Sequence, residues 1–150
     1  MDDLDGRSPE RVRAQPSWWL NQAAGLANRL VAAELADVGA RRHHVSLLAA
    51  LEEGGPTSQA DLGRRTWIDR SDVVAALDEL TVGGFVVRDP DPTDRRRNVV
   101  TVTAAGRRHL AKLERRLTRA QDALLADLDD VERAELLTLL RRVVTTPHLS

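Results

Sequence analysis

Cysteine is absent from this chain of 150 residues. Without thiols the chain can form no disulfide and no thiolate metal site, and a sensor that works by cysteine oxidation is excluded. Aromatic residues are also scarce, with three Trp, one Phe and no Tyr. Because large rings are few, we expect a core that consists mainly of Leu, Val and Ala.

No apolar run reaches the roughly 18 residues that a membrane span requires. The acidic start at Asp2, Asp3 and Asp5 does not resemble a signal peptide. We therefore expect no membrane partner and a cytoplasmic location. The length suits one domain that buries its own core, so residues 1–150 are expected to form a single unit.

A net charge of -1 conceals a strongly uneven distribution of charge. Nine basic residues and a single acid, Glu114, lie between positions 95 and 119, and acidic residues dominate positions 122–135. A basic patch for nucleic acid explains this pattern, and so does a solvated helix face with compensating charges. Charge alone leaves both interpretations open, and the order of the structural elements has to decide between them.

Helix-favouring residues dominate the chain, and β-branched residues gather only around positions 86–102, so the fold class is expected to be mainly α with one small sheet. Residues 1–15 lack an apolar period and are expected to form a loose arm. Helical spacing of apolar residues predicts helices from Trp18 to near Gly39, from His44 to about Leu51, for about six turns after Thr103, and from Asp129 or Asp130 to Pro147. Since the first and last helices carry much apolar surface, we expect a homodimer.

Two further helices are predicted between these segments. Ser58 is placed to cap a short helix that ends near Arg65, and Asp61 faces the positive end of that helix. A break follows at residues 66–68, and Asp69 then caps a helix with apolar positions at 73, 77 and 80. Two helices joined by a turn of three or four residues form a candidate helix-turn-helix.

The apolar pattern then changes its period. Two β-rich runs, at residues 85–88 and 99–103, flank a polar turn that carries three consecutive arginines. Pro90 and Pro92 are expected to exclude regular ladder pairing at their positions. The segment is therefore predicted to be an exposed β-hairpin, or wing.

Residues 58–106 resemble the MarR family of winged helix-turn-helix transcriptional regulators. The segment SQADLGRR at 58–65 resembles the family's third helix, DRS at 69–71 the start of the recognition helix, and GFVVR at 84–88 the first wing strand. The sequence DPTDRRR at 91–97, followed by VTVTAAG at 100–106, resembles the wing signature.

The resemblance implies a homodimeric, ligand-responsive repressor that binds a palindromic operator in double-stranded DNA. It assigns residues 17–52 and 104–146 to dimerisation and core helices, and residues 57–103 to the DNA-binding lobe. It also implies a small-molecule effector whose identity the sequence does not reveal. The alternative is a winged-helix module for protein contacts without specific DNA binding, a function to which acidic Asp72 and the low net charge point.

The resemblance also distributes roles among the candidate DNA-binding residues. Asp94 and Arg96 match the family's Asp-x-Arg pair, so Arg96 is expected in the minor groove with Asp94 orienting its guanidinium group. Phosphate contacts are expected from Ser58, Gln59, Arg95 and Arg97. In the recognition helix, Arg70 is suited to guanine and Asp72 to the amino group of cytosine, although capping and first-turn electrostatics explain Ser71 and Asp72 equally well.

Three positions depart from the family pattern. Trp67 occupies a turn position that is often Gly, and Val74 and Ala75 replace commonly polar or basic residues of the recognition helix. Base contacts from the second turn of that helix are therefore doubtful, and specificity is expected to shift toward DNA shape and the wing.

Neither a metal site nor a cofactor site emerges, and no constellation of acid, base and nucleophile indicates an enzyme. His43 and His44 are adjacent and point about 100° apart on a helix, unlike the i, i+4 spacing that chelates a metal. One of the two is expected to pack near the dimer base or effector cleft, with the other exposed. Trp18, His43 and His44 are the candidate effector residues, while dimer packing is the preferred interpretation of Trp18 and Trp19.

Overall fold

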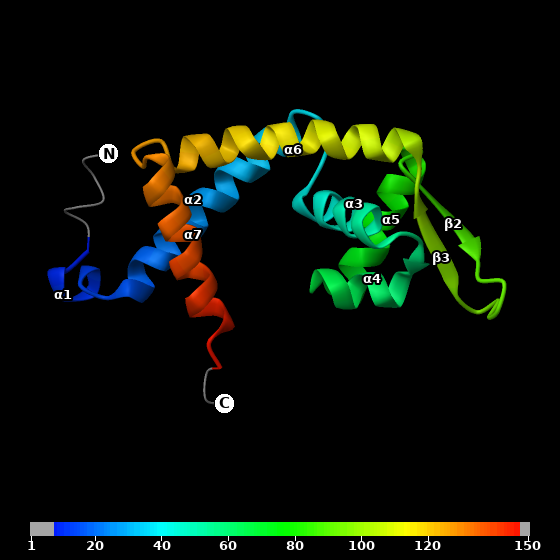
Figure 1. Cartoon of the computed structure of the whole chain (residues 1–150), viewed down its shortest axis with the longest axis horizontal. Helices are drawn as coiled ribbons and strands as arrows, with labels where there is room; N and C mark the ends of the chain where they lie inside the picture. The colour runs from blue at the N-terminus through cyan, green and yellow to red at the C-terminus, as the bar shows by residue number, and fades with distance from the viewer. Residues whose placement is uncertain (1–7, 148–150) are drawn as a thin grey trace.

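The computed structural model describes residues 8–147. The helices are α1 (Glu10–Arg13), α2 (Pro16–Ala36), α3 (Arg42–Gly54), α4 (Gln59–Thr66), α5 (Arg70–Val82), α6 (Ala104–Leu124) and α7 (Asp130–Thr145). They form two groups joined by α6: α1, α2 and α7 lie at one end of the molecule, and α3, α4, α5 and the sheet lie at the other (Figure 1). None of the helices in the described part of the chain is long and apolar enough to cross a membrane.

The sheet has three antiparallel strands in the order β1-β3-β2. Strands β2 (Val86–Pro90) and β3 (Asn98–Val102) form the wing, and β1 (Thr57–Ser58) pairs with the other side of β3. The sequence did not indicate β1, because two residues are too short to show a period. The expectation that Pro90 lies outside the ladder was wrong, since it pairs with Asn98 at the end of β2. An edge strand tolerates proline because one side of it needs no backbone donor.

The core lies between α3, α4, α5, the sheet and α6, and it extends along the contact between α2 and α6. It is built mainly from Leu, with Val and Ala, as expected. The largest fully buried side chains are Leu35, Leu47, Leu48, Leu51, Leu62, Leu77, Leu80, Leu110 and Leu113, with Val73, Val86 and Val100. Phe85, the single Phe, stacks on His109 with ring centroids 3.9 Å apart.

Most helix boundaries agree with those predicted from the sequence. Thr103 caps α6 by accepting from the backbone N–H of Gly106, and Asp129 caps α7 in a reciprocal arrangement with Glu132. Asp69 occupies the N-cap position of α5, but its side chain makes no capping hydrogen bond, which corrects the predicted cap. The helical turn α1 falls within the segment expected to be a loose arm, of which residues 1–7 lie outside the described residues.

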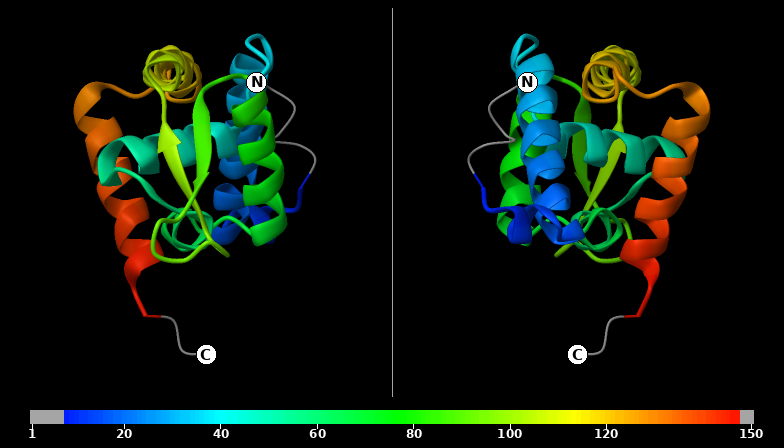
Figure 2. Two further views of the ribbon diagram at one scale, coloured as in Figure 1. Left: turned by 90° about the vertical axis from the view of Figure 1, so that its right-hand side faces the viewer. Right: turned by 90° about the vertical axis from the view of Figure 1, so that its left-hand side faces the viewer.

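Helix α6 connects the two groups of helices and is held against α2 by charge as well as by packing. Nη1 of Arg116 lies 3.3 Å from Oε2 of Glu34 and 3.2 Å from Oδ2 of Asp37. Helix α7, in contrast, has no buried residue. Helices α2 and α7 lie apart from each other (Figure 2), and apolar side chains on both remain in contact with solvent.

Gly106 is the tightest glycine of the fold, and Gly106→Ala is expected to lower the free energy of unfolding by about 2–3 kcal/mol. A Cβ atom at this position would meet the carbonyl oxygen of Phe85 and would lie 2.8 Å from Cγ2 of Val102. Urea denaturation measures the change. The control is Gly63→Ala, where the new methyl group makes only ordinary contacts, the nearest at 3.5 Å. Equal stability of the two variants would contradict the packing described here.

Candidate nucleic-acid interface

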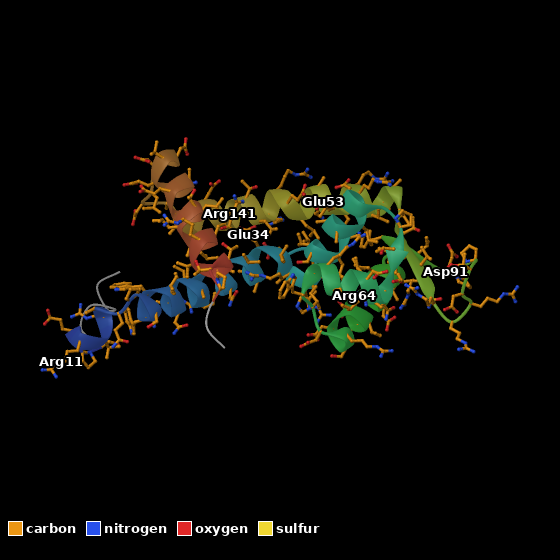
Figure 3. All side chains as sticks on the ribbon, turned by 60° about the horizontal axis from the view of Figure 1, so that its bottom comes forward. Arg11, Glu34, Glu53, Arg64, Asp91 and Arg141 are labelled. Atoms are coloured by element: carbon orange, nitrogen blue, oxygen red, sulfur yellow. The ribbon has the colours of Figure 1, made fainter. Side chains whose placement is uncertain are left out.

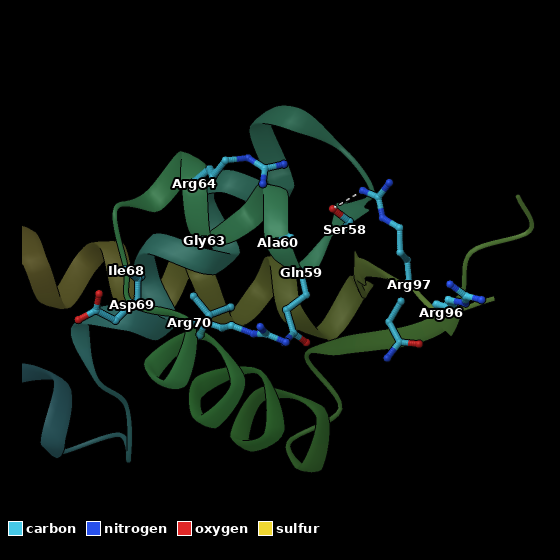
Figure 4. A pocket seen from close by; sticks show the side chains of 12 residues that line it. Ser58, Gln59, Ala60, Gly63, Arg64, Ile68, Asp69, Arg70, Arg96 and Arg97 are labelled. Atoms are coloured by element: carbon cyan, nitrogen blue, oxygen red, sulfur yellow. Dashed lines mark hydrogen bonds between the residues drawn. The ribbon is translucent and has the colours of Figure 1, made fainter. Parts of the chain in front are cut away.

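Helices α4 and α5 meet the wing around an open groove of about 580 Å³. The groove is lined by the start and exposed side of α4, by the turn that joins α4 to α5, by the first turn of α5 and by residues 96–98 of the wing (Figure 4). Of the predicted DNA-binding residues, the structure brings Ser58, Gln59, Arg70, Arg96 and Arg97 to this groove.

The wing is joined to α4 through Asp61. Oγ of Ser58 donates to Oδ2 of Asp61 at 2.7 Å, and Nη2 of Arg97 donates to the same hydroxyl at 3.0 Å and lies 3.4 Å from that carboxylate oxygen. Arg64 pairs with the other carboxylate oxygen. The hydrogen bond from Ser58, followed by that from Arg64, lowers the pKa of Asp61. Asp61 therefore stays ionised and holds the base of the wing against α4.

These contacts change the interpretation of two predicted phosphate-binding residues. The Ser58 side chain is buried, and its hydroxyl also accepts from the backbone N–H of Asp61. The Arg97 guanidinium is already engaged within the chain. Both residues position the wing, a role that the sequence pattern did not reveal because Asp61 and Arg97 are 36 residues apart.

The wing tip is shaped by two aspartates. Oδ1 of Asp91 accepts from the backbone N–H and hydroxyl of Thr93, and the backbone hydrogen bond lowers the pKa of Asp91 most. Oδ1 of Asp94 accepts from the backbone N–H of Arg96 at 3.0 Å. Asp94 thus orients the main chain of Arg96, and not its guanidinium group as expected. Asp91, which lies in the wing loop (Figure 3), was not among the predicted site residues.

Several arginines of the predicted site have side chains without a partner. Arg95 and Arg96 at the wing and Arg70 in the first turn of α5 are exposed, and their guanidinium groups make no hydrogen bond or ion pair among residues 8–147. Ser71 and Asp72 are exposed beside Arg70. Free cations at the exposed start of a helix and on the neighbouring wing are suited to bind a polyanion.

Helix α5 is also held by ionic contacts, most of which are partly exposed. Arg88 of β2 pairs with Asp78, and Arg41 and His44 both contact the carboxylate of the neighbouring Glu79. Nε2 of His44 lies 2.6 Å from Oε2 of Glu79, and Nδ1 of His44 accepts from the backbone N–H of Arg41 at 3.2 Å. These two contacts require a neutral ring that carries its proton on Nε2.

Within a single subunit, the candidate effector residues do not lie close to one another. His44 is buried against α5, and His43 is half-buried, not exposed. Trp18 lies in the first turn of α2, at the end remote from α3 (Figure 1), where its ring meets Trp19 edge to face with centroids 4.6 Å apart. A hollow that the sequence did not indicate lies between α2 and the start of α3, lined by Asn28, Val31, Ala32, Ala36, Ala40, Arg41 and Arg42. Among the described residues, no group of three or more His, Asp or Glu side chains is placed to hold a metal ion.

Comparisons with known proteins agree on one family. The sequence model of the MarR family matches residues 37–97. The crystal structure of a probable transcriptional regulator from Pseudomonas aeruginosa is 31% identical, with 86% of this chain and 96% of that chain aligned and a TM-score of 0.76. The transcriptional repressor CouR bound to a 23-mer DNA duplex is 26% identical over 90% of this chain and 96% of that chain, with a TM-score of 0.81.

A curated relative is the HTH-type transcriptional repressor NicR of Pseudomonas putida, which is 31% identical over 65% of this chain and 61% of its own length. The chain spans 53% to 61% of the length of the first curated relatives that it matches. The names of these relatives describe transcriptional regulators.

The neutral state of His44 predicts that acid destabilises the fold. Burial outweighs the contact with Glu79 and lowers the pKa of His44, and burial also lowers the pKa of His109. An unfolded chain binds protons at these positions once the pH falls through about 6.5, whereas the folded chain resists them. The free energy of unfolding should therefore decrease as the pH is lowered from 7.5 to 5.5.

Urea denaturation across this pH range checks the prediction. His44→Gln should reduce the pH dependence of the free energy of unfolding but keep the part that His109 contributes. The matched control His43→Gln should leave the pH dependence as it is in the parent protein. A fold that becomes more stable on acidification would show that the attraction of Glu79 dominates and that His44 is charged.

Proposed function

The chain belongs to the MarR family of transcriptional regulators, and on this premise we propose that residues 57–103 bind duplex DNA in a sequence-specific manner. The observation that carries the proposal is the groove between α4, α5 and the wing, beside which Arg70, Arg95 and Arg96 present free guanidinium groups. An exposed helix of this kind fits the major groove of B-DNA, and flanking cations bind its phosphates.

In the proposed complex the wing reads the minor groove. Arg96 enters a narrow A·T-rich minor groove, whose negative potential attracts a guanidinium group. Arg95 contacts the adjacent phosphates. Asp94 orders the wing tip and Arg97 holds the base of the wing against the start of α4 through their contacts within the chain.

The start of α5 reads the major groove. Arg70 donates to O6 and N7 of guanine, Asp72 accepts from the amino group of cytosine, and Ser71 contacts either base or backbone. Gln59 contacts a phosphate from the start of α4, where the helix dipole adds to the attraction. Ser58 supports that contact by capping the helix. Val74 is half-buried and Ala75 lacks a polar group, so base contacts end at the first turn.

We further propose that the active protein is a homodimer and a repressor. Trp19 on α2 and Leu137 and Val144 on α7 are 51%, 49% and 78% exposed, although each is strongly apolar. If a second copy covers these faces, a twofold axis relates the two α5 helices of the dimer. A dimer with this symmetry binds two half-sites of a palindromic operator. The repressor role is supported by the names of NicR and CouR.

The proposed effector is a small anion that binds between α2 and α3. Arg41 and Arg42 line the hollow of about 390 Å³ at this position, and Arg41 also contacts Glu79 of α5. An anion that draws Arg41 away from Glu79 would change how α5 is held, which couples the hollow to DNA binding.

Arg96→Ala is expected to weaken binding to the operator by about 10- to 100-fold, because each subunit loses a groove contact. The slope of binding against salt concentration should also decrease. Fluorescence anisotropy with duplex DNA from the region upstream of the gene, at two salt concentrations, measures both quantities. The control Arg108→Ala removes the same charge from an exposed position on α6 and should bind like the parent.

Unchanged affinity of Arg96→Ala would refute the wing assignment. If the parent protein shows no binding above that of a scrambled duplex at either salt concentration, the winged lobe serves protein contacts instead.

Val144→Asp is expected to raise the dimer dissociation constant by about tenfold or more, because a twofold interface receives the buried charge twice. Analytical ultracentrifugation over a range of concentrations measures the change. The control is Val82→Asp, which places the same substitution at a valine that is 91% exposed at the end of α5. A parent protein that stays monomeric at all concentrations would contradict the proposed dimer.

A further inference from the structure

Trp67 is the most exposed large apolar side chain in the described part of the chain. It is 96% exposed, so its indole contacts almost nothing in the fold. Indole rings contribute to stability when they are buried, and a ring in this position contributes nothing to the core. The side chain is therefore not explained by folding.

The backbone of Trp67 is equally unusual. At φ 56° and ψ 29° it lies in the left-handed region, and it is the one residue other than glycine with positive φ among residues 8–147. Glycine adopts this conformation without steric penalty, whereas a side chain with a Cβ atom is strained there. A bulky residue held in a strained conformation points to a function outside the fold.

The location of Trp67 indicates which function. It ends α4 and begins the turn to α5. The candidate DNA groove is lined by residues on both sides of it in the sequence, namely Gly63 and Arg64 before it and Ile68 to Arg70 after it. Figure 4 shows Ile68 and Asp69 at the end of the groove that lies away from Arg96 and Arg97. Trp67 immediately precedes Ile68, so it belongs to the turn at the end of the groove away from the wing.

A duplex seated on α5 places one sugar-phosphate backbone on each side of the recognition helix. The wing meets the backbone on one side, and the turn that contains Trp67 meets the backbone on the other. Three exposed arginines, Arg64, Arg65 and Arg70, flank this turn in the sequence. Arg64 is paired with Asp61 and the turn itself carries Asp69, so Arg65 and Arg70 supply the positive charge that favours a polyanion over an apolar protein surface.

We propose that Trp67 is an additional DNA-contact residue, with its ring packed on deoxyribose and its indole N–H donating to a phosphate oxygen. Indole has one donor and no acceptor, which suits an anionic partner. A backbone contact carries no base information, so Trp67 sets affinity and the seating of α5 without changing which sequence is preferred. This inference depends on the proposed DNA-binding function.

The test compares Trp67→Gly with the parent protein on the upstream duplex and on a scrambled duplex. Glycine suits the positive φ, so the variant should unfold at the same or higher urea concentration. Its affinity should nevertheless fall about tenfold on both duplexes, since a charge-assisted backbone contact is lost. The salt slope should stay unchanged, because no cation is removed. The control Arg95→Ala, which removes a proposed phosphate contact from each subunit, should lower the slope by about two.

Acrylamide quenching gives a direct readout. The difference in emission between the parent and Trp67→Phe isolates the indole of Trp67 from those of Trp18 and Trp19. That difference signal should be strongly quenched in the free protein and shielded when the duplex is added.

The outcomes separate this inference from the function on which it depends. A parent protein that binds no duplex refutes both. A parent that binds, together with a Trp67→Gly variant of equal affinity or an indole that stays accessible in the complex, refutes the contact and leaves the DNA-binding function standing. A change in the monomer-dimer equilibrium of Trp67→Gly would assign the indole to a second copy of the chain and would also refute the contact.

Discussion

The carboxylate of Asp61 is the contact on which the arrangement of the interface depends. It is contacted by Ser58 at the start of α4, by Arg64 in the last turn of α4 and by Arg97 at the base of the wing. An acidic group within a basic surface opposes a polyanion by its charge. It also fixes where the surrounding cations lie, and position is what distinguishes specific from nonspecific binding.

A similar ionic contact holds helix α5 against the start of α3. Glu79 of α5 accepts from Arg41 and contacts His44, both at the start of α3, while Asp78 pairs with Arg88 of the wing. Helix α5 is therefore attached at once to the wing and to the region where α2 joins α3. Because Arg41 also lines the hollow beside α2, a change at that junction has a short physical route to α5 and the candidate DNA-binding surface.

Local patterns were sufficient to predict most of the elements. The capping residues Ser58, Thr103 and Asp129, the glycine-rich helix ends and the change of period at the wing depend on neighbouring residues, and they appear in the structure where expected. Asp69 and Pro90 were misjudged for opposite reasons. Asp69 has a side chain that can accept a capping hydrogen bond, but it makes none. Pro90 lacks a backbone N–H for a β-ladder, but it is tolerated because it lies at the end of an edge strand.

The sequence by itself determined the helix order, the wing, the leucine core and the family resemblance, because each follows from residues within a few positions of one another. Only the tertiary structure decided that Arg97 and Ser58 are occupied within the chain, that His44 is neutral against Glu79, and that Trp67 stands free in a left-handed turn. Those properties depend on contacts between segments up to 39 residues apart and on backbone angles, and neither is encoded in a local period.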